Sequence, residues 1–156
     1  MGTSRRKFFG LSLATGSVLL SIKTGLIRIR EAQAEWPSAA FEASSTQDAL
    51  ASMFGDEPII ESNKIVIDVV DLAEDSSVIP IKVKANLESA EQITIVADKN
   101  PVPLVATFKL GQSVVDGYVA TRIKLAGPSH VLVVVKANGK LYSAQKFVTV
   151  TNGGCG

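Results

Sequence analysis

The sequence predicts an all-β fold, an immunoglobulin-like antiparallel β-sandwich of about seven strands, for residues 35–150. Apolar and polar side chains alternate along most of the chain after Lys64, which is the pattern of half-buried strands. Turn residues interrupt these runs roughly every eight to twelve residues, a spacing typical of sandwiches. The length of 156 residues and the hydrophobic fraction of 46% fit one globular domain with a short appendage.

Alternating runs and apolar runs together supply the seven expected strands. Ile65–Val70 and Val131–Val135 are almost wholly apolar, and they therefore predict central strands that are covered on both faces. Asn138-Gly139 stands between Val131–Lys136 and Leu141–Val150, and this dipeptide predicts a two-residue hairpin. The other strands are expected at residues 79–86, 93–97, 104–108 and 119–125.

One short amphipathic helix is expected before the strands, at about residues 45–54. Three apolar residues at i, i+3 and i+4 spacing end at Phe54, so they share one helix face. Ser44 or Ser45 is a suitable N-cap, and Gly55 is a suitable stop.

The first 34 residues have the pattern of a twin-arginine export signal. Arg5 and Arg6 precede a weakly apolar stretch of about fifteen residues, which is too short to span a membrane. Ala32-Gln33-Ala34 then provides the small residues expected before a signal peptidase cut. The alternative is an amphipathic N-terminal helix with two accidental arginines. The export signal predicts a soluble periplasmic protein without a stable membrane anchor.

Charge and composition exclude several function classes. Residues 35–156 hold ten basic and fourteen acidic side chains, a formal charge of −4, so nucleic-acid binding is not expected. One His and one Cys cannot build a four-ligand zinc site, an iron–sulfur cluster or a haem attachment, and no metal site or catalytic residue is predicted. His130 is expected to be a surface or capping residue. The carboxylates of Glu74-Asp75 and of Asp68 with Asp71 are expected to be solvated.

The most informative residues lie at the C-terminus, where Cys155 is flanked by Gly153, Gly154 and Gly156. Glycine provides no apolar neighbour that would bury the thiol, and its backbone entropy opposes order at a chain end. A tail from Val150 to Cys155 reaches about 17 Å, slim enough to enter a narrow pocket of another protein. The thiol has a reference pKa of about 8.5, and no base in the sequence is placed to lower it. We therefore expect a partner enzyme to perform the chemistry on the thiol of this chain. The chain itself is expected to have no catalytic activity.

At these residues the sequence resembles the SoxY family, the sulfur-carrier subunits of bacterial thiosulfate oxidation. The resemblance rests on the twin-arginine leader, the β-rich domain, Lys99-Asn100-Pro101 and Gly153-Gly154-Cys155-Gly156. The family tail usually has one more glycine after the last of these. The resemblance implies that Cys155 is the covalent attachment site, that the three glycines form a swinging arm, and that no cofactor is needed. It also implies a heterodimer with a second small β-sandwich subunit, SoxZ. Haem enzymes and other sulfur-oxidising enzymes of the Sox pathway are the further partners that it implies.

A second function class stays open from the residues alone. Cys155 would then only form an intermolecular disulfide, making the chain an interaction module in the periplasm. Gly-Gly near a C-terminus also occurs in ubiquitin-like sulfur carriers with a terminal thiocarboxylate, but export and the intervening Cys155 argue against that reading. The sequence does not say whether thiosulfate, sulfide or both supply the sulfur.

Overall fold

The computed structural model describes residues 38–111 and 117–151 of the chain. Contacts divide the chain into Met1–Glu35 and Trp36–Gly156, and the fold described below belongs to the second unit. Arg5 and Arg6 lie outside the described residues, and so do Cys155 and its glycines.

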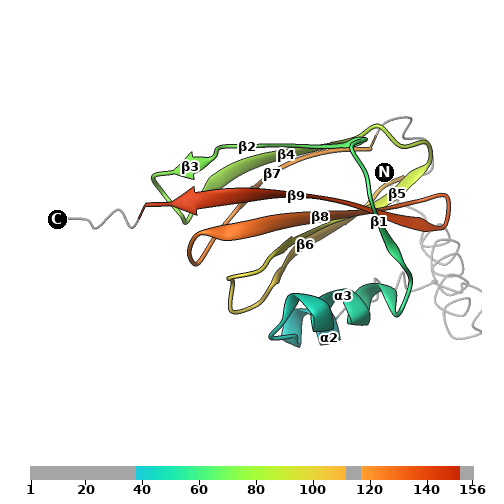
Figure 1. The fold of residues 1–156 in the computed structure, drawn as a ribbon, viewed down its shortest axis with the longest axis horizontal. Helices are drawn as coiled ribbons and strands as arrows, with labels where there is room; N and C mark the ends of the chain where they lie inside the picture. Colours follow the sequence, from blue (N-terminus) through green and yellow to red (C-terminus); the bar gives the residue numbers. More distant parts are fainter. Residues whose placement is uncertain (1–37, 112–116, 152–156) are drawn as a thin grey trace, which may run out of the picture. The chain divides into compact units, whose positions relative to one another are not determined.

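Two β-sheets form the layers of a sandwich (Figure 1). The larger sheet has the strand order β1-β9-β8-β5-β6, and β3 pairs with the far end of β9. The smaller sheet has the order β2-β4-β7. The larger sheet consists of β1 (Ile59–Glu61), β3 (Leu72–Ala73), β5 (Ala90–Ala97), β6 (Leu104–Lys109), β8 (Ser129–Ala137) and β9 (Lys140–Val150). The smaller sheet consists of β2 (Ile65–Val69), β4 (Ile79–Ala85) and β7 (Gly117–Ile123).

The core between the sheets follows from the alternation in the sequence. In β4, Ile79, Ile81 and Val83 are buried, while Pro80 and Lys82 are exposed. Burying each of these branched side chains contributes about 1.5–3 kcal/mol of transfer free energy. The sandwich expected from the period of two is thus confirmed.

Two helices, α2 (Ser38–Glu42) and α3 (Thr46–Phe54), pack on the larger sheet. The helix expected at residues 45–54 is confirmed, and the Ser45 hydroxyl caps it by accepting a hydrogen bond of 3.0 Å from the Asp48 N–H. No helix among the described residues is long and apolar enough to cross a membrane.

The hairpin between β8 and β9 also forms as predicted. Asn138 and Gly139 have φ values of 50° and 66°, as a type I′ turn requires at both central positions. The Asn138 side chain donates to the Glu88 carbonyl at 3.0 Å, which ties the hairpin to the turn before β5.

Two features of the sheets differ from the sequence-based expectation. The seven strands of five or more residues pair antiparallel, but the short strands β1 and β3 were not expected, and both pair with β9 in parallel. The prediction of a central strand at Ile65–Val70 is wrong, because β2 is an edge strand that pairs with β4 alone in its sheet. Its run is apolar except for Asp68 because Val66 and Val70, although apolar, lie on the outer surface, 49% and 45% exposed. Val131–Val135 does lie in a central strand, β8.

Candidate functional site

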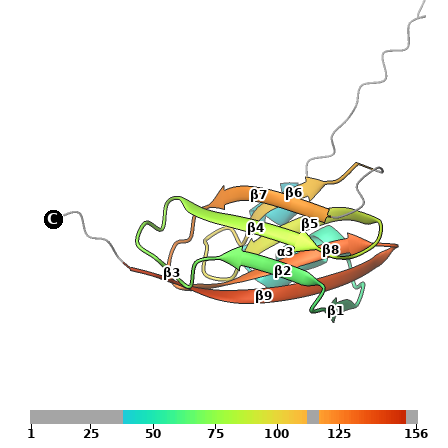
Figure 2. The ribbon, with the colours of Figure 1, turned by 90° about the horizontal axis from the view of Figure 1, so that it is seen from above.

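The last strand, β9, leads to the tail that carries Cys155. It pairs with β8 from Lys140 to Val148, with β1 at Leu141–Ser143 on its other side, and with β3 at its end, so its direction is set by pairing along its whole length. Figures 1 and 2 show that β9 ends beside β3, at one end of the sandwich. Thr151 is the last described residue, and the position of the thiol itself stays outside the description.

The short strand β3 anchors the end of β9. Leu72 lies beside Thr149, and Ala73 lies beside Val150. The Thr149 N–H donates to the Asp71 carbonyl at 2.8 Å, and the Thr151 N–H donates to the Ala73 carbonyl at 3.0 Å. The backbone is therefore fixed as far as Thr151. Cys155 follows four residues later, a chain length of about 14 Å when extended.

A lysine joins the two sheets next to this anchor. Lys146 in β9 donates from Nζ to the Val69 carbonyl of β2 at 2.6 Å and lies 3.0 Å from Asp71 Oδ1. The Lys146 side chain is 34% exposed, whereas that of Asp71 is 87% exposed. Water screens an ion pair of this kind, so the hydrogen bond to the carbonyl is the larger stabilising contact. The sequence analysis did not select Lys146. The feature that could have pointed to it is a lysine within a largely apolar strand. In the structure this lysine lies opposite the buried Val131.

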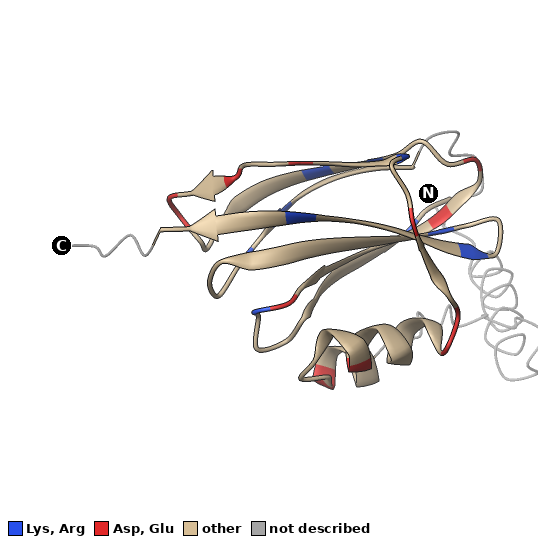
Figure 3. Ribbon diagram, in the orientation of Figure 1, with Lys and Arg blue, Asp and Glu red and all other residues tan. Residues whose placement is uncertain are grey.

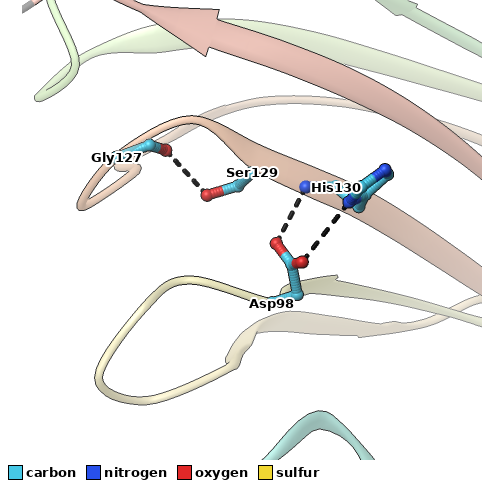
Figure 4. A network of polar contacts seen from close by, with 4 residues as sticks. All are labelled: Asp98, Gly127, Ser129 and His130. Atoms are coloured by element: carbon cyan, nitrogen blue, oxygen red, sulfur yellow. Dashed lines mark hydrogen bonds and ion pairs between the residues drawn. The ribbon is translucent and has the colours of Figure 1, made fainter.

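At the same end of the sandwich, two side chains of the β5–β6 loop bind the segment that connects β7 to β8 and the start of β8. The Asn100 amide donates to the Lys124 carbonyl at 2.9 Å and accepts from the Ala126 N–H at 2.8 Å. The Asp98 carboxylate accepts from the His130 N–H at 2.8 Å (Figure 4). Asn100 belongs to the Lys99-Asn100-Pro101 stretch, and the structure gives this asparagine a role in holding the loops.

His130 lies on the surface, as expected. Its side chain is 52% exposed, its Nδ1 lies 3.4 Å from Asp98 Oδ2, and its ring is tilted against Phe147 with centroids 4.9 Å apart. Across the described part of the chain, no three His, Cys, Asp or Glu side chains come together as metal ligands would.

The carboxylates considered in the sequence are solvated, in agreement with the prediction. The side chains of Asp68 and Asp71 are 68% and 87% exposed. Asp75 accepts hydrogen bonds from the hydroxyl and the N–H of Ser77, and these hold the pKa of the Asp75 carboxyl below its ordinary value. This contact orders the turn before β4 and has no geometry for acid–base chemistry with a second group.

The fold is a small β-sandwich, and its last strand leads to the chain end that carries Cys155. The chain belongs to the SoxY family: the family model described as "Sulfur oxidation protein SoxY" matches residues 50–155. This match covers the domain from the middle of α3 to the cysteine of the tail. It gives the chain a carrier role in sulfur oxidation, within the Sox system.

A solved structure agrees with this assignment. The chain is 36% identical to the sulfur carrier protein SoxY from Chlorobium limicola f. thiosulfatophilum, with a TM-score of 0.63. The alignment covers 74% of this chain and 99% of that one.

Other comparisons add little. Two structures of the superoxide reductase (neelaredoxin) from Ignicoccus hospitalis align at 11% and 9% identity, with TM-scores of 0.47 and 0.46. They cover 60% and 70% of this chain, and 94% and 91% of their own. No curated protein sequence matches the chain.

Proposed function

We propose that this protein carries thiosulfate-derived sulfur covalently on the Cys155 thiol, in the periplasm, and presents it to enzymes of sulfur oxidation. One observation supports the proposal above the others. Backbone hydrogen bonds hold the chain as far as Thr151, and the Gly-Gly-Cys-Gly end begins two residues later in a chain of the SoxY family. A fixed base with a slim chain end beyond it suits a thiol that must enter the active sites of other proteins.

The proposed loading step is an oxidation. The Cys155 thiol and thiosulfate form an S–S bond, giving Cys–S–S–SO₃⁻, and they release one proton and two electrons. A haem enzyme of the pathway accepts the two electrons. The thiol of the carrier supplies only the sulfur atom that forms the new bond.

The proposed later steps leave the carrier sulfur in place. Water attacks the outer sulfonate sulfur, the S–SO₃ bond breaks, and sulfate leaves while a persulfide stays on Cys155. A second redox enzyme then accepts six electrons while the outer sulfane sulfur takes up three oxygen atoms from water and becomes a sulfonate, and hydrolysis releases it as sulfate and restores the thiol. An S–S linkage suits this task, since its outer sulfur is open to attack and oxidation. The carrier needs no cofactor for any of these steps.

The same proposal includes export and a partner subunit. The twin-arginine leader with Arg5 and Arg6 would direct the folded chain to the periplasm, and a SoxZ-like β-sandwich subunit would form the heterodimer. Export in the folded state fits a partner that lacks its own leader, since the two subunits can assemble first. Gly153, Gly154 and Gly156 act as the swinging arm.

Intact-mass spectrometry of the protein from the periplasm of cells oxidising thiosulfate tests the proposal. Thiosulfate on Cys155 adds about 112 Da, and one retained sulfur adds about 32 Da. Both additions should be absent from the variant Cys155→Ser. If the wild-type protein occurs only as the reduced monomer and a disulfide-linked dimer, the interaction-module alternative is correct.

A further inference from the structure

The outer face of the smaller sheet is not covered by any other described element of the fold. The two helices pack on the larger sheet, so the smaller sheet has one face on the core and one on solvent. We call this outer surface the basic face. Its exposed residues are Val66, Asp68, Pro80, Lys82, Lys84, Tyr118, Ala120 and Arg122.

The basic face has a charge opposite to that of the domain. Lys82 lies 3.3 Å from Asp68, which balances one cation. Lys84 stands between Val66 and Tyr118 in the register, and Arg122 lies beside Pro80, so neither has an acidic neighbour across the strands. Figure 3 marks the lysine positions of β4 in blue on the ribbon. The surface therefore carries an excess of two positive charges, although residues 35–156 have a net charge of −4.

The basic face is apolar towards one end and hollowed towards the other. Tyr118 and Val66 stand on either side of Lys84 in the register, are 53% and 49% exposed, and form the apolar end. Pro80 and Ala120, together with Lys82 and Arg122, border an open hollow of about 520 Å³. Small side chains between long ones leave room for a side chain that projects from another protein.

The hollow lies on the half of the face that is nearer to the C-terminal anchor. The register pairs Pro80, at the start of β4, with Arg122, at the end of β7. The turn before β4 is joined to the segment after β7 by a hydrogen bond from the Leu125 N–H to the Ser76 carbonyl, at 2.9 Å. Figures 1 and 2 show the start of β4 and the end of β9 at the same end of the sandwich.

We infer that the basic face is a transient docking surface for the enzymes that act on the tail, and that it fits an acidic, partly apolar protein surface beside their active-site entrance. The inference rests on the proposed carrier function. Three strands of about seven residues present about 330 Å² in projection. A stable interface needs about 800 Å² on each partner, so this area suits a brief encounter rather than a permanent subunit contact.

Charge on the basic face would act mainly on the rate of encounter. Oppositely charged surfaces steer two proteins together, and salt screens this attraction over a Debye length of about 8–10 Å. A carrier must also leave each enzyme quickly, which favours steering over tight binding. The expected signature is a change in kcat/KM at low salt with little change in kcat, because the reacting thiol is the same.

The test uses the exported carrier with its partner subunit as substrate for the purified haem enzyme, with haem reduction by thiosulfate as the readout. The double variant Lys84→Glu/Arg122→Glu should lower kcat/KM by about tenfold or more at low salt, and the loss should shrink at high salt. Lys109→Glu/Lys140→Glu makes the same change in charge at exposed sites outside the smaller sheet and should lower kcat/KM much less.

Each outcome decides a different point. Equal kcat/KM for wild type and the double variant, or equal losses in both double variants, overturns the docking surface and leaves the carrier function standing. Failure of the wild-type carrier to support any haem reduction overturns the proposed function itself. Binding of wild type, but not of the double variant, to vesicles of anionic phospholipid would show that the basic face meets a membrane and would also overturn the inference.

Discussion

Replacing Lys146 with methionine should loosen the anchor of the tail while keeping most of the packing. Methionine retains much of the apolar volume of lysine but cannot donate to the Val69 carbonyl, which now accepts at 2.6 Å. A hydrogen bond from a charged donor contributes about 1.5–3 kcal/mol, and the exposed contact with Asp71 contributes at most about 1 kcal/mol. Because Lys146 is one-third exposed, water can partly replace it. We expect a loss of about 1–2 kcal/mol in the free energy of unfolding.

Urea unfolding and amide hydrogen exchange measure this effect. With an m-value of about 2 kcal/mol/M, the unfolding midpoint should fall by about 0.5–1 M while m stays constant. The amides of Thr149 and Thr151 donate within the anchor, and their exchange should accelerate more than that of the central strand β8. Asp71→Asn, which removes only the charge, should shift the midpoint much less. An unchanged midpoint together with unchanged exchange at both amides would refute the role given to Lys146.

Three further predictions concern packing and the tail. Gly117→Ala should destabilise the fold by about 1–3 kcal/mol in thermal unfolding, because the added methyl would lie 2.9 Å from the Ala90 Cβ, whereas Gly111→Ala, with nothing within 4 Å, should be near neutral. Cys155→Ser should leave the unfolding midpoint unchanged and abolish the sulfur adduct in intact mass; an adduct on the serine variant would contradict it. Changing Gly153 and Gly154 to valine should slow transfer to every enzyme partner, and unchanged turnover would argue against entry of the arm into narrow pockets.

Local patterns were enough to predict the parts of the fold whose signals lie within a few residues. The Asn138-Gly139 turn needs positive φ at both positions, and asparagine and glycine allow it. The alternation in β4 places every second residue in the core, because successive strand residues point to opposite faces. These signals do not depend on which strands become neighbours.

Features set by distant pairing could not be predicted in the same way. Leu72–Ala73 is too short for a periodic pattern, and it becomes a strand only because β9 offers free backbone groups beside it. Ile65–Val70 has the composition of a central strand, but its place at an edge depends on the order of the sheet. The role of Lys146 depends on its hydrogen bond to the Val69 carbonyl, 77 residues earlier in the chain. The role of Cys155 as the attachment site was predicted from the sequence. It stays a prediction, because the structure describes the chain only as far as Thr151.

Isotopic labelling of the two sulfur atoms of thiosulfate tests the carrier function most directly. Cells are given thiosulfate labelled either in its sulfane sulfur or in its sulfonate sulfur, and the C-terminal peptide of the protein is then analysed by mass spectrometry. Covalent carriage on Cys155 predicts that the sulfane label stays on this peptide after sulfate has left, while the sulfonate label is recovered as sulfate. A peptide that never acquires the sulfane label during thiosulfate oxidation would contradict the account.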